Sequence, residues 1–459
     1  MKYETVNPAT GERIRAHETQ SGAEVLDIVS ACADAQRLWW ELPIEERLPY
    51  FTRLASVLRE NKDRFGGLIT LEMGKPISEA VGEVEKCAWL CEVYAENGLD
   101  WLEEELVQAD GLEHRVVFQP LGVILSVMPW NFPFWQALRF GVPGLMAGNG
   151  SVLKHASNVP QCSMAIEEAF ALAGFPKNLF RSVLAGHDTV SEMIASDKIA
   201  GVSLTGSTNA GEAIAALAGK HLKKVVLELG GSDPFIVLED ADLDFAVEGA
   251  VRGRMICAGQ SCIAAKRFIV HEAIADEFTQ RFAERMAALR VGDPMLPTTQ
   301  VGPVVHEKAL KELLAQIVEA RDLGGKILCG GSRLEGPGSF LEPTVISGTR
   351  PQMRVVSEET FGPVAPVIVV ENDEEAVSVA NDTEFGLGGS VWTRDLARGQ
   401  SLARKLEVGT VFVNSIVKSD PRMPFGGVKK SGLGRELSHY GLKEFVNVKG
   451  INIYSHGIA

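Results

Sequence analysis

The sequence predicts an α/β protein with two doubly wound α/β domains and a β-hairpin arm. Its 459 residues exceed the size at which a single hydrophobic core stops growing, so two or more domains are expected. From Gly122 onward, short apolar runs alternate with helical stretches, which is typical of a parallel sheet wound with helices. A second alternating region begins near Asp233 and indicates a second domain of the same class.

The chain starts with a predicted helical region. Residues 23–105 carry apolar side chains at three-to-four spacing with charged faces between them, most clearly in 45–59 and 78–102. The first wound sheet should follow. Its expected strands are 123–128, 151–154, 181–185, 201–204 and 225–229, and its expected helices are near 134–147, 159–174, 188–196 and 209–219.

The second wound region runs to the C-terminal part of the chain. Helices are expected near 241–256, 272–289 and 306–323, and strands near 267–270, 342–346, 364–370 and 409–413. The domain boundary is placed at Gly230-Gly231, where the first sheet ends. One segment fits neither domain, because residues 112–120 alternate like a strand and follow the turn Asp110-Gly111. Taken alone, this segment is interpreted equally well as an ordinary surface hairpin or as an arm that contacts another subunit.

Composition excludes several classes of function. The formal charge of −15 argues against nucleic acid or an anionic membrane as partner, because both require a basic face. Seven cysteines, odd in number and without metal-ligand spacing, indicate a reduced cytoplasmic protein with no disulfide framework and no metal site. The first residues contain no apolar signal core, and no long uncharged apolar stretch follows. We therefore expect a soluble protein that is not exported.

Three segments carry residues suited to nucleophilic catalysis. Cys262 lies in Gly-Gln-Ser-Cys-Ile-Ala-Ala, and its thiolate is a nucleophile once its pKa falls from about 8.5. Glu228 lies in Leu-Glu-Leu-Gly-Gly and supplies a carboxylate that activates water. Asn131 lies in Pro-Trp-Asn-Phe-Pro, and its amide can donate a hydrogen bond to the oxyanion of a tetrahedral intermediate.

The order and spacing of these segments resemble the aldehyde dehydrogenase superfamily. The resemblance continues through residues 359–363 and 424–432, so it covers nearly the whole chain. It implies an aldehyde dehydrogenase-like fold with an NAD(P)-binding domain over 1–106 and 121–230 and a catalytic domain over 231–440. It also implies that 107–120 and 441–459 form an oligomerisation arm of a homodimer or homotetramer.

The cofactor site implied by the resemblance lacks the usual dinucleotide fingerprint, because no Gly-x-Gly-x-x-Gly follows any expected strand. Gly206 and Ser207 open a helix whose free N–H groups suit a pyrophosphate, although Ser207 alone is a helix N-cap. Lys154 matches the lysine that contacts the adenosine ribose of the cofactor in the family. Its alternative interpretation is a lysine that is simply exposed to solvent. The residues expected at the cofactor are Trp130, Lys154, Ser157, Gly206, Ser207, Leu229, Glu359 and Phe361.

Ser157 decides the expectation about cofactor choice. Many NAD-preferring relatives carry glutamate at this position, and an acid there repels a 2′-phosphate. Serine removes that repulsion, and Lys154 lies three residues away. Both NADP and NAD are therefore expected cofactors, with their preference left open.

The implied mechanism begins with attack of Cys262 on an aldehyde, giving a thiohemiacetal whose oxyanion is held by Asn131 and the Cys262 backbone N–H. Hydride transfer to the nicotinamide gives a thioester, which Glu228 hydrolyses by activating water. Presence of Glu228 favours hydrolysis over transfer to coenzyme A. Cys257 is interpreted either as a residue supporting the site or as a redox partner, and the other five cysteines as small buried hydrophobes.

The expected substrate-contacting residues are Arg139, Trp135 and Ser419. Arg139 matches an arginine of succinate-semialdehyde dehydrogenases and suits a distal carboxylate, and its alternative role is a structural ion pair. Ile256 replaces a second arginine of some such enzymes, so Lys418, Ser419 or Arg422 is expected to compensate. Several sequence segments resemble those of the bacterial Sad-type succinate-semialdehyde dehydrogenases, which favours succinate semialdehyde as substrate. Glutarate semialdehyde, aliphatic or aromatic aldehydes, a silent NAD-binding protein and a thiol hydrolase remain alternatives.

Overall fold

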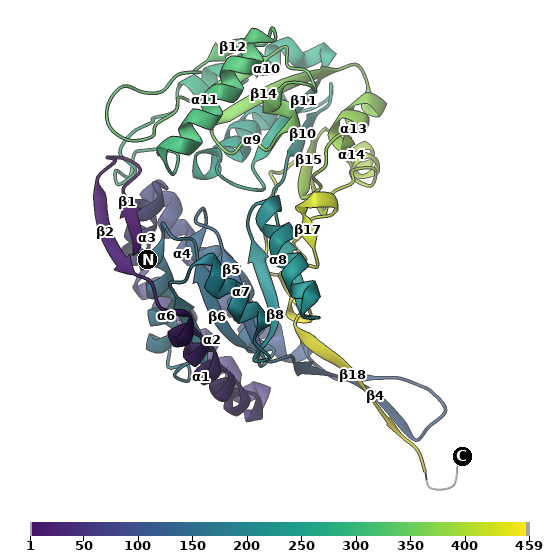
Figure 1. Cartoon of the computed structure of the whole chain (residues 1–459). Coiled ribbons are helices and arrows are strands. Elements are labelled where there is room, and N and C mark those ends of the chain that lie inside the picture. Colours follow the sequence, from purple (N-terminus) through teal and green to yellow (C-terminus); the bar gives the residue numbers. More distant parts are fainter. Residues whose placement is uncertain (1, 456–459) are drawn as a thin grey trace.

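The computed structural model describes residues 2–455, which form two lobes with a strand arm extending from one of them (Figure 1). One lobe contains a six-stranded sheet and the other a seven-stranded sheet, and both are mainly parallel. The predicted class, α/β with two wound units, is confirmed. Residue 1 of the predicted first domain and residues 456–459 of the predicted arm lie outside the described residues.

Four helices precede the first wound sheet, as the spacing of apolar residues predicted. Ser21 and Glu24 form a capping box that starts the first helix, satisfying backbone N–H groups that have no partner within it. Gly74, at φ 82°, ends the third in the left-handed conformation that glycine adopts without strain. The helices are α1 (Gly22–Glu41), α2 (Ile44–Glu60), α3 (Lys62–Met73) and α4 (Ile77–Trp101).

The six-stranded sheet has the order β17-β9-β8-β5-β6-β7. The chain winds from β5 through β6 to β7 on one side and returns to β8 on the other, so the strand order reverses between β5 and β8. Ligands bind beyond the carboxyl ends of strands at such a switch point. The strands are β5 (Val123–Met128), β6 (Gly150–His155), β7 (Phe180–Val183), β8 (Ile199–Thr205), β9 (Lys224–Glu228) and β17 (Gly432–Leu433), and the helices between them are α5 (Pro133–Met146), α6 (Pro160–Leu172), α7 (His187–Ala195) and α8 (Thr208–Lys220).

The seven-stranded sheet has the order β12-β13-β14-β11-β10-β15-β16, and only β12 runs antiparallel to its neighbour. Its strands are β10 (Asp233–Val237), β11 (Ala265–His271), β12 (Lys326–Cys329), β13 (Thr344–Ser347), β14 (Val364–Val370), β15 (Gly388–Trp392) and β16 (Thr410–Val413). The associated helices are α9 (Leu243–Met255), α10 (Glu272–Ala287), α11 (Glu307–Asp322), α12 (Arg354–Ser357), α13 (Asp373–Asn381) and α14 (Leu396–Ala403).

The chain crosses between the lobes more than once. It passes from β9 to β10 through Gly230-Gly231, the position where we place the domain boundary. It returns before residue 440, because β17 pairs with β9 in the first sheet. Three further short elements are η1 (Ile256–Gly259), between α9 and β11, and η2 (Lys429–Ser431) and α15 (Ser438–Leu442), on either side of β17. The domain limits themselves stay a prediction.

The arm is a three-stranded antiparallel sheet with the order β18-β4-β3 (Figure 1). Its long pair joins β4 (Glu113–Pro120) to β18 (Val446–Ile453) along their whole lengths. The short strand β3 (Glu105–Leu106) pairs with β4, so the sheet begins two residues before the predicted arm. A separate N-terminal hairpin, β1 (Lys2–Val6) and β2 (Arg13–Glu18), was not among the predicted strands.

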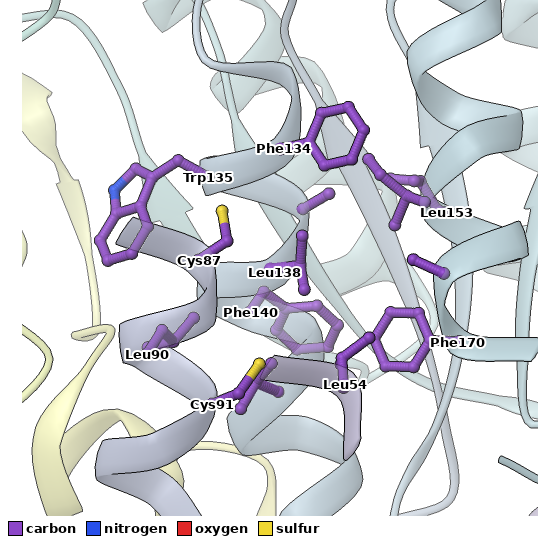
Figure 2. Close-up of a cluster of buried hydrophobic side chains, with 14 of the residues drawn as sticks. Leu54, Cys87, Leu90, Cys91, Phe134, Trp135, Leu138, Phe140, Leu153 and Phe170 are labelled. Atoms are coloured by element: carbon purple, nitrogen blue, oxygen red, sulfur yellow. The ribbon is translucent and has the colours of Figure 1, made fainter. Parts of the chain in front are cut away.

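A large hydrophobic cluster joins the N-terminal helices to the first sheet (Figure 2). Helix α5 contributes Phe134, Leu138 and Phe140, and α4 contributes Cys87 and Cys91, which are fully buried small side chains. Trp135 lies at one edge of the cluster in this view. The packing fixes α4 and α5 against each other, and both helices reach the site described below. No helix among residues 2–455 is long and apolar enough to cross a membrane.

Candidate active site

Two cavities meet at Cys262, which lines both of them together with Gln136. The larger cavity has a volume of about 630 Å³ and lies between α4, α5, α9 and the segment 415–419. The smaller has a volume of about 240 Å³ and lies beyond the carboxyl ends of β5, β8 and β9, at the switch point of the first sheet. A reactive group at Cys262 is therefore accessible from two sides by two different molecules.

The loop before Cys262 has an unusual backbone. Cys257, Ala258 and Gly259 have φ values of 55°, 53° and 76°, a left-handed run that costs energy for the two residues with a Cβ. The buried Arg254 holds the loop, because its guanidinium donates to the backbone carbonyl oxygens of Gly259, Thr360 and Ala265. These contacts tie the loop before Cys262 to the segment that carries Glu359.

Burial raises the pKa of the Cys262 thiol to about 12, while the positive charges of Lys266 and Arg139 oppose this rise. The Lys266 ammonium lies close by, since it donates to the Cys262 carbonyl oxygen at 2.7 Å. The side chain is thus a neutral thiol near neutral pH in this arrangement. Its activation requires additional stabilisation of the thiolate.

The Asn131 amide is buried and oriented by hydrogen bonds at both ends. Gln136 Nε2 donates to Asn131 Oδ1 at 3.1 Å, and Asn131 Nδ2 donates to the Gln260 carbonyl oxygen at 2.9 Å. This fixes Nδ2 as the donor end of the amide. Asn131 lines the smaller cavity together with Cys262, so the amide and the thiol face the same space.

Glu228 ends β9 but lines neither cavity. Its carboxyl group is buried, and neither oxygen has a hydrogen-bond partner within residues 2–455. Burial and the negative charge of Glu436 raise its pKa well above the ordinary value, with Arg139 opposing. The carboxyl group therefore favours its neutral form more than an exposed glutamate does, and its neighbours include the charged groups of Arg139, Glu436 and Arg435.

Glu359 lies in the smaller cavity and is held in place by two groups. Its Oε1 accepts from the Gly231 backbone N–H at 3.1 Å and lies 3.3 Å from Lys266 Nζ. Phe361 follows, with its ring edge-on to Trp130 at 5.9 Å between centroids. Both rings line the cavity and give it an apolar wall.

Gly206, Ser207 and Leu229 also line the smaller cavity. Ser207 is the N-cap of α8, and its hydroxyl accepts from the Ala210 N–H at 3.3 Å. The helix-cap role expected for this serine from the sequence is therefore formed. The N-terminus of α8 presents backbone N–H groups beside this cavity, an arrangement that favours anions.

Lys154 and Ser157 lie at the carboxyl end of β6 and do not line the smaller cavity. Burial lowers the pKa of Lys154, which is half-buried. Its side-chain ammonium has no hydrogen-bond or ion-pair partner among residues 2–455. Ser157 is exposed in the turn that follows the strand. A half-buried cation without a partner, next to an exposed hydroxyl, suits an anionic ligand group.

Arg139 is buried on α5 and already has a carboxylate partner. Its Nε forms an ion pair with Glu436, its Nη2 donates to Thr205 Oγ1 at 3.3 Å, and its guanidinium lies 4.6 Å from the Phe425 ring centroid. Arg139 also lines the larger cavity. Of the two interpretations drawn from the sequence, the structural ion pair is therefore formed, and the guanidinium faces the cavity as well.

Trp135 and Ser419 line the larger cavity, and a lysine that sequence reasoning missed lies between them. Lys86 Nζ donates to Ser419 Oγ at 2.7 Å and lies 4.1 Å from the Trp135 ring centroid. Lys418 is exposed in the same cavity, whereas Arg422 pairs with Asp420 and does not line it. Only its helical spacing relative to Glu83 marked Lys86 in the sequence, which does not distinguish it from a surface lysine.

The six cysteines other than Cys262 line neither of these two cavities, and five of them are buried. All seven are free, and no cluster of three or more metal-ligating side chains exists among the described residues. Cys257 is fully buried, its backbone N–H donates to Glu79, and its thiol donates to the Asn131 carbonyl oxygen at 3.5 Å. This residue supports the loop that carries Asn131.

The comparisons with known proteins agree over nearly the whole chain. The model of the Aldehyde dehydrogenase family matches residues 1–451. A probable succinate-semialdehyde dehydrogenase [NADP(+)] of Synechocystis is 48% identical over 98% of this chain and 99% of that protein. Succinate semialdehyde dehydrogenase [NAD(P)+] Sad of Escherichia coli is 44% identical over 97% of each. Succinic semialdehyde dehydrogenase of Streptococcus pyogenes, solved with NADP+, superimposes with a TM-score of 0.96 at 37% identity, covering 99% of this chain and 100% of that one.

Proposed function

This chain belongs to the aldehyde dehydrogenase family, and we propose that it oxidises succinate semialdehyde to succinate with NADP, and also with NAD. The observation that carries the proposal is the position of Cys262, where a cavity at the switch point of the first sheet meets a second, larger cavity. The smaller cavity receives the nicotinamide end of the cofactor, and the larger receives the aldehyde.

Catalysis starts with the Cys262 thiolate, which attacks the aldehyde carbon and forms a thiohemiacetal. Asn131 Nδ2 donates to the oxyanion, because its amide is already oriented by Gln136 and faces the same cavity as the thiol. A nicotinamide held in the smaller cavity would accept the hydride that leaves the thiohemiacetal carbon, and the product on Cys262 is a thioester. Thiolate formation is favoured by Lys266 and Arg139, whose positive charges oppose the raised pKa of the thiol.

Glu228 is the proposed general base for hydrolysis of the thioester. Its pKa is raised well above the usual range by burial and by Glu436, which makes the ionised carboxylate a stronger base than that of an exposed glutamate. The base form is present above that pKa and is lost below it, so hydrolysis should accelerate as the pH rises. Because Glu228 lines neither cavity in this arrangement, its carboxylate has to approach the thioester once it ionises.

The cofactor fits the residues present. Six side chains or backbone segments expected to hold it line the smaller cavity: Trp130, Gly206, Ser207, Leu229, Glu359 and Phe361. Lys154 has no partner within residues 2–455 and lies beside Ser157, which together suit a 2′-phosphate. No carboxylate occupies position 157, so nothing there repels NADP.

The experiment is a substrate panel run with both cofactors. Reduced nicotinamide should form most efficiently with succinate semialdehyde and NADP, with lower kcat/KM for glutarate semialdehyde, butyraldehyde and benzaldehyde. Equal or higher kcat/KM for butyraldehyde would overturn the substrate assignment and leave a broad-range aldehyde dehydrogenase. Absence of cofactor reduction with every aldehyde would overturn the enzymatic assignment.

We further propose a homodimer or homotetramer assembled through the arm, located in the cytoplasm. The arm exposes apolar side chains that a second copy would cover: Leu106, Val448, Ile451, Ile453 and Tyr454. Free cysteines throughout the chain suit a reducing compartment. Light scattering tests the assembly, because Ile451→Glu should lower the measured mass to that of a smaller species, and an unchanged mass would exclude the arm as the interface.

A further inference from the structure

A buried lysine on β11 holds the backbone on both sides of Cys262. The Lys266 side chain is 1% exposed, and its Nζ donates to the Ser261 carbonyl oxygen at 2.8 Å and to the Cys262 carbonyl oxygen at 2.7 Å. In the mechanism proposed above, Lys266 acts on the thiol only through its charge. The two hydrogen bonds give this lysine a geometrical role as well.

The Ser261 carbonyl belongs to the same peptide group as the Cys262 N–H. In a planar trans peptide group, the C=O and the N–H point in opposite directions. Lys266 lies at the oxygen end, so the Cys262 N–H points away from the ammonium. The Ala264 N–H donates to the same oxygen at 3.2 Å. This peptide group is therefore fixed from its carbonyl side by two donors.

The Cys262 N–H itself is free to bind a ligand, because it donates to no acceptor among residues 2–455. A cation at the carbonyl oxygen polarises the peptide group and strengthens its N–H as a donor. A free and polarised N–H on the residue that carries the attacking sulfur suits the oxyanion that forms when this sulfur adds to a carbonyl carbon.

Two carboxyl groups hold the ammonium in place. Glu359 Oε1 lies 3.3 Å from Lys266 Nζ and also accepts from the Gly231 backbone N–H at 3.1 Å. Burial raises the pKa of Asp233 to about 7, and Lys266 is first among the groups that oppose this rise. Gly231 packs against the Cys262 carbonyl, because a Cβ there would lie 2.7 Å from the oxygen. The ammonium and the carbonyl oxygen consequently have little room to move.

We propose that Lys266 is a positioning residue of the reaction, which orients the Cys262 N–H as the second donor to the oxyanion beside the Asn131 amide. This inference rests on the proposed function, since it uses the attack of Cys262 on a carbonyl carbon. Lys266 lines neither cavity, so it acts through the Ser261–Cys262 peptide group and not by contact with the substrate.

Two reactions of Cys262 separate this role from an effect on the thiolate. With iodoacetamide, the sulfur bonds to the methylene carbon and iodide leaves, so no oxyanion forms. With p-nitrophenyl acetate, the sulfur adds to the ester carbonyl, and the resulting oxyanion collapses to a thioester as p-nitrophenolate leaves. Both rates depend on the thiolate fraction, whereas only the second depends on an oxyanion donor. Their ratio at one pH therefore isolates the donor.

Lys266→Met should lower the ratio of acylation to alkylation about tenfold. This is less than the roughly 10²–10³-fold cost of removing an oxyanion donor outright, because the N–H remains but is no longer held. The first phase of p-nitrophenolate release gives the acylation rate, and peptide mass spectrometry gives the alkylation rate. Cys262→Ala supplies the background of both reactions.

Two further variants accompany this measurement. Lys266→Gln is neutral and one atom shorter but keeps a polar end, so it should lower the ratio in the same direction and covers the case in which methionine prevents folding. Arg267→Met is the matched control, because it removes a buried cation of the same strand. Its contacts are the carbonyl oxygens of residues 232, 379 and 380, and its loss should leave the ratio unchanged.

Equal falls of both rates in the Lys266 variants, with an unchanged ratio, would show that Lys266 only stabilises the thiolate and would overturn the inference. A ratio lowered to the same extent by Arg267→Met would overturn it too. Failure of the proposed function is seen separately, because neither reagent is an aldehyde and neither reaction uses a nicotinamide. A chain that reduces no cofactor with any aldehyde would still show the change in the ratio.

Discussion

Cys262 combines an accessible position with an unfavourable ionisation. It opens onto two cavities, yet burial raises the pKa of its thiol to about 12. Among the cations, Lys266 opposes this rise most; it is buried and contacts the Cys262 carbonyl oxygen and Glu359. The thiol is therefore protected at neutral pH and becomes a nucleophile only when the thiolate is stabilised further.

Alkylation measures this ionisation directly. We expect the rate of Cys262 carboxamidomethylation by iodoacetamide, without cofactor, to rise roughly tenfold per pH unit between pH 7 and 10, because the thiolate fraction grows by that factor below the pKa. A Cys329→Ser background removes the other cysteine that is not fully buried, and peptide mass spectrometry gives the rate. A rate that levels off near pH 8 would show that the thiol ionises far more readily.

Ser157 sets the expected response to the cofactor phosphate. Ser157→Glu should raise KM for NADP much more than KM for NAD, because a carboxylate beside Lys154 neutralises the cation and repels the 2′-phosphate. Ser157→Gln is the matched control, with similar size and no charge. Equal changes for both cofactors would show that Ser157 does not face the adenosine ribose.

At the residue scale, sequence reasoning found groups that lie in recognisable motifs. Cys262, Asn131 and Glu359 come from such motifs, and the structure places all three at the smaller cavity. Lys86 and Lys266 were missed, because their importance depends on partners far away in the chain, Ser419 and Glu359. The sequence also could not indicate that the carboxyl group of Glu228 lies outside both cavities.

Elements are joined beside the site by a buried ion pair. Arg139 belongs to α5 and Glu436 follows β17, and their side chains are 3% and 4% exposed. Burial raises the pKa of Glu436, and Arg139 opposes the rise, so the two charges stabilise each other. Loss of one partner leaves the other charge buried without compensation.

Arg139→Met should consequently destabilise the protein by roughly 3–5 kcal/mol. The double variant Arg139→Met, Glu436→Gln should recover most of this loss, because neither charge is then left unpaired. Urea unfolding followed by circular dichroism measures both variants and Glu436→Gln alone. A double variant that loses the sum of the two single losses would show that the pair has no mutual stabilisation.

The elements themselves were largely predictable where periodicity is strong. The helices α5, α6 and α8 and the strand β5 agree with the predicted ranges within one or two residues. Strand β15 was not predicted, since Gly388-Gly389 interrupts its apolar pattern and its strand character comes from neighbours β10 and β16. The pairing of β4 with β18 joins segments more than 300 residues apart, and only the family resemblance indicated it.

At the scale of the whole molecule, two lobes meet where a cysteine of the second lies at the edge of the first. The cavity at the switch point and the larger cavity share Cys262. In the proposed mechanism, this arrangement brings a hydride acceptor and an aldehyde to one sulfur atom. The central claim is that this sulfur carries the substrate as a thioester while Glu228 is needed to release it.

Peptide mass spectrometry of Glu228→Gln, quenched after mixing with NADP and succinate semialdehyde, tests this claim most directly. We expect about one equivalent of reduced cofactor, formed in a burst that then stalls, and a succinyl group on the peptide that contains Cys262, because hydride transfer precedes the hydrolysis that requires the base. The Cys262→Ala, Glu228→Gln variant should show neither. A burst without a modified Cys262 peptide, or a succinyl group on another cysteine, would contradict the account.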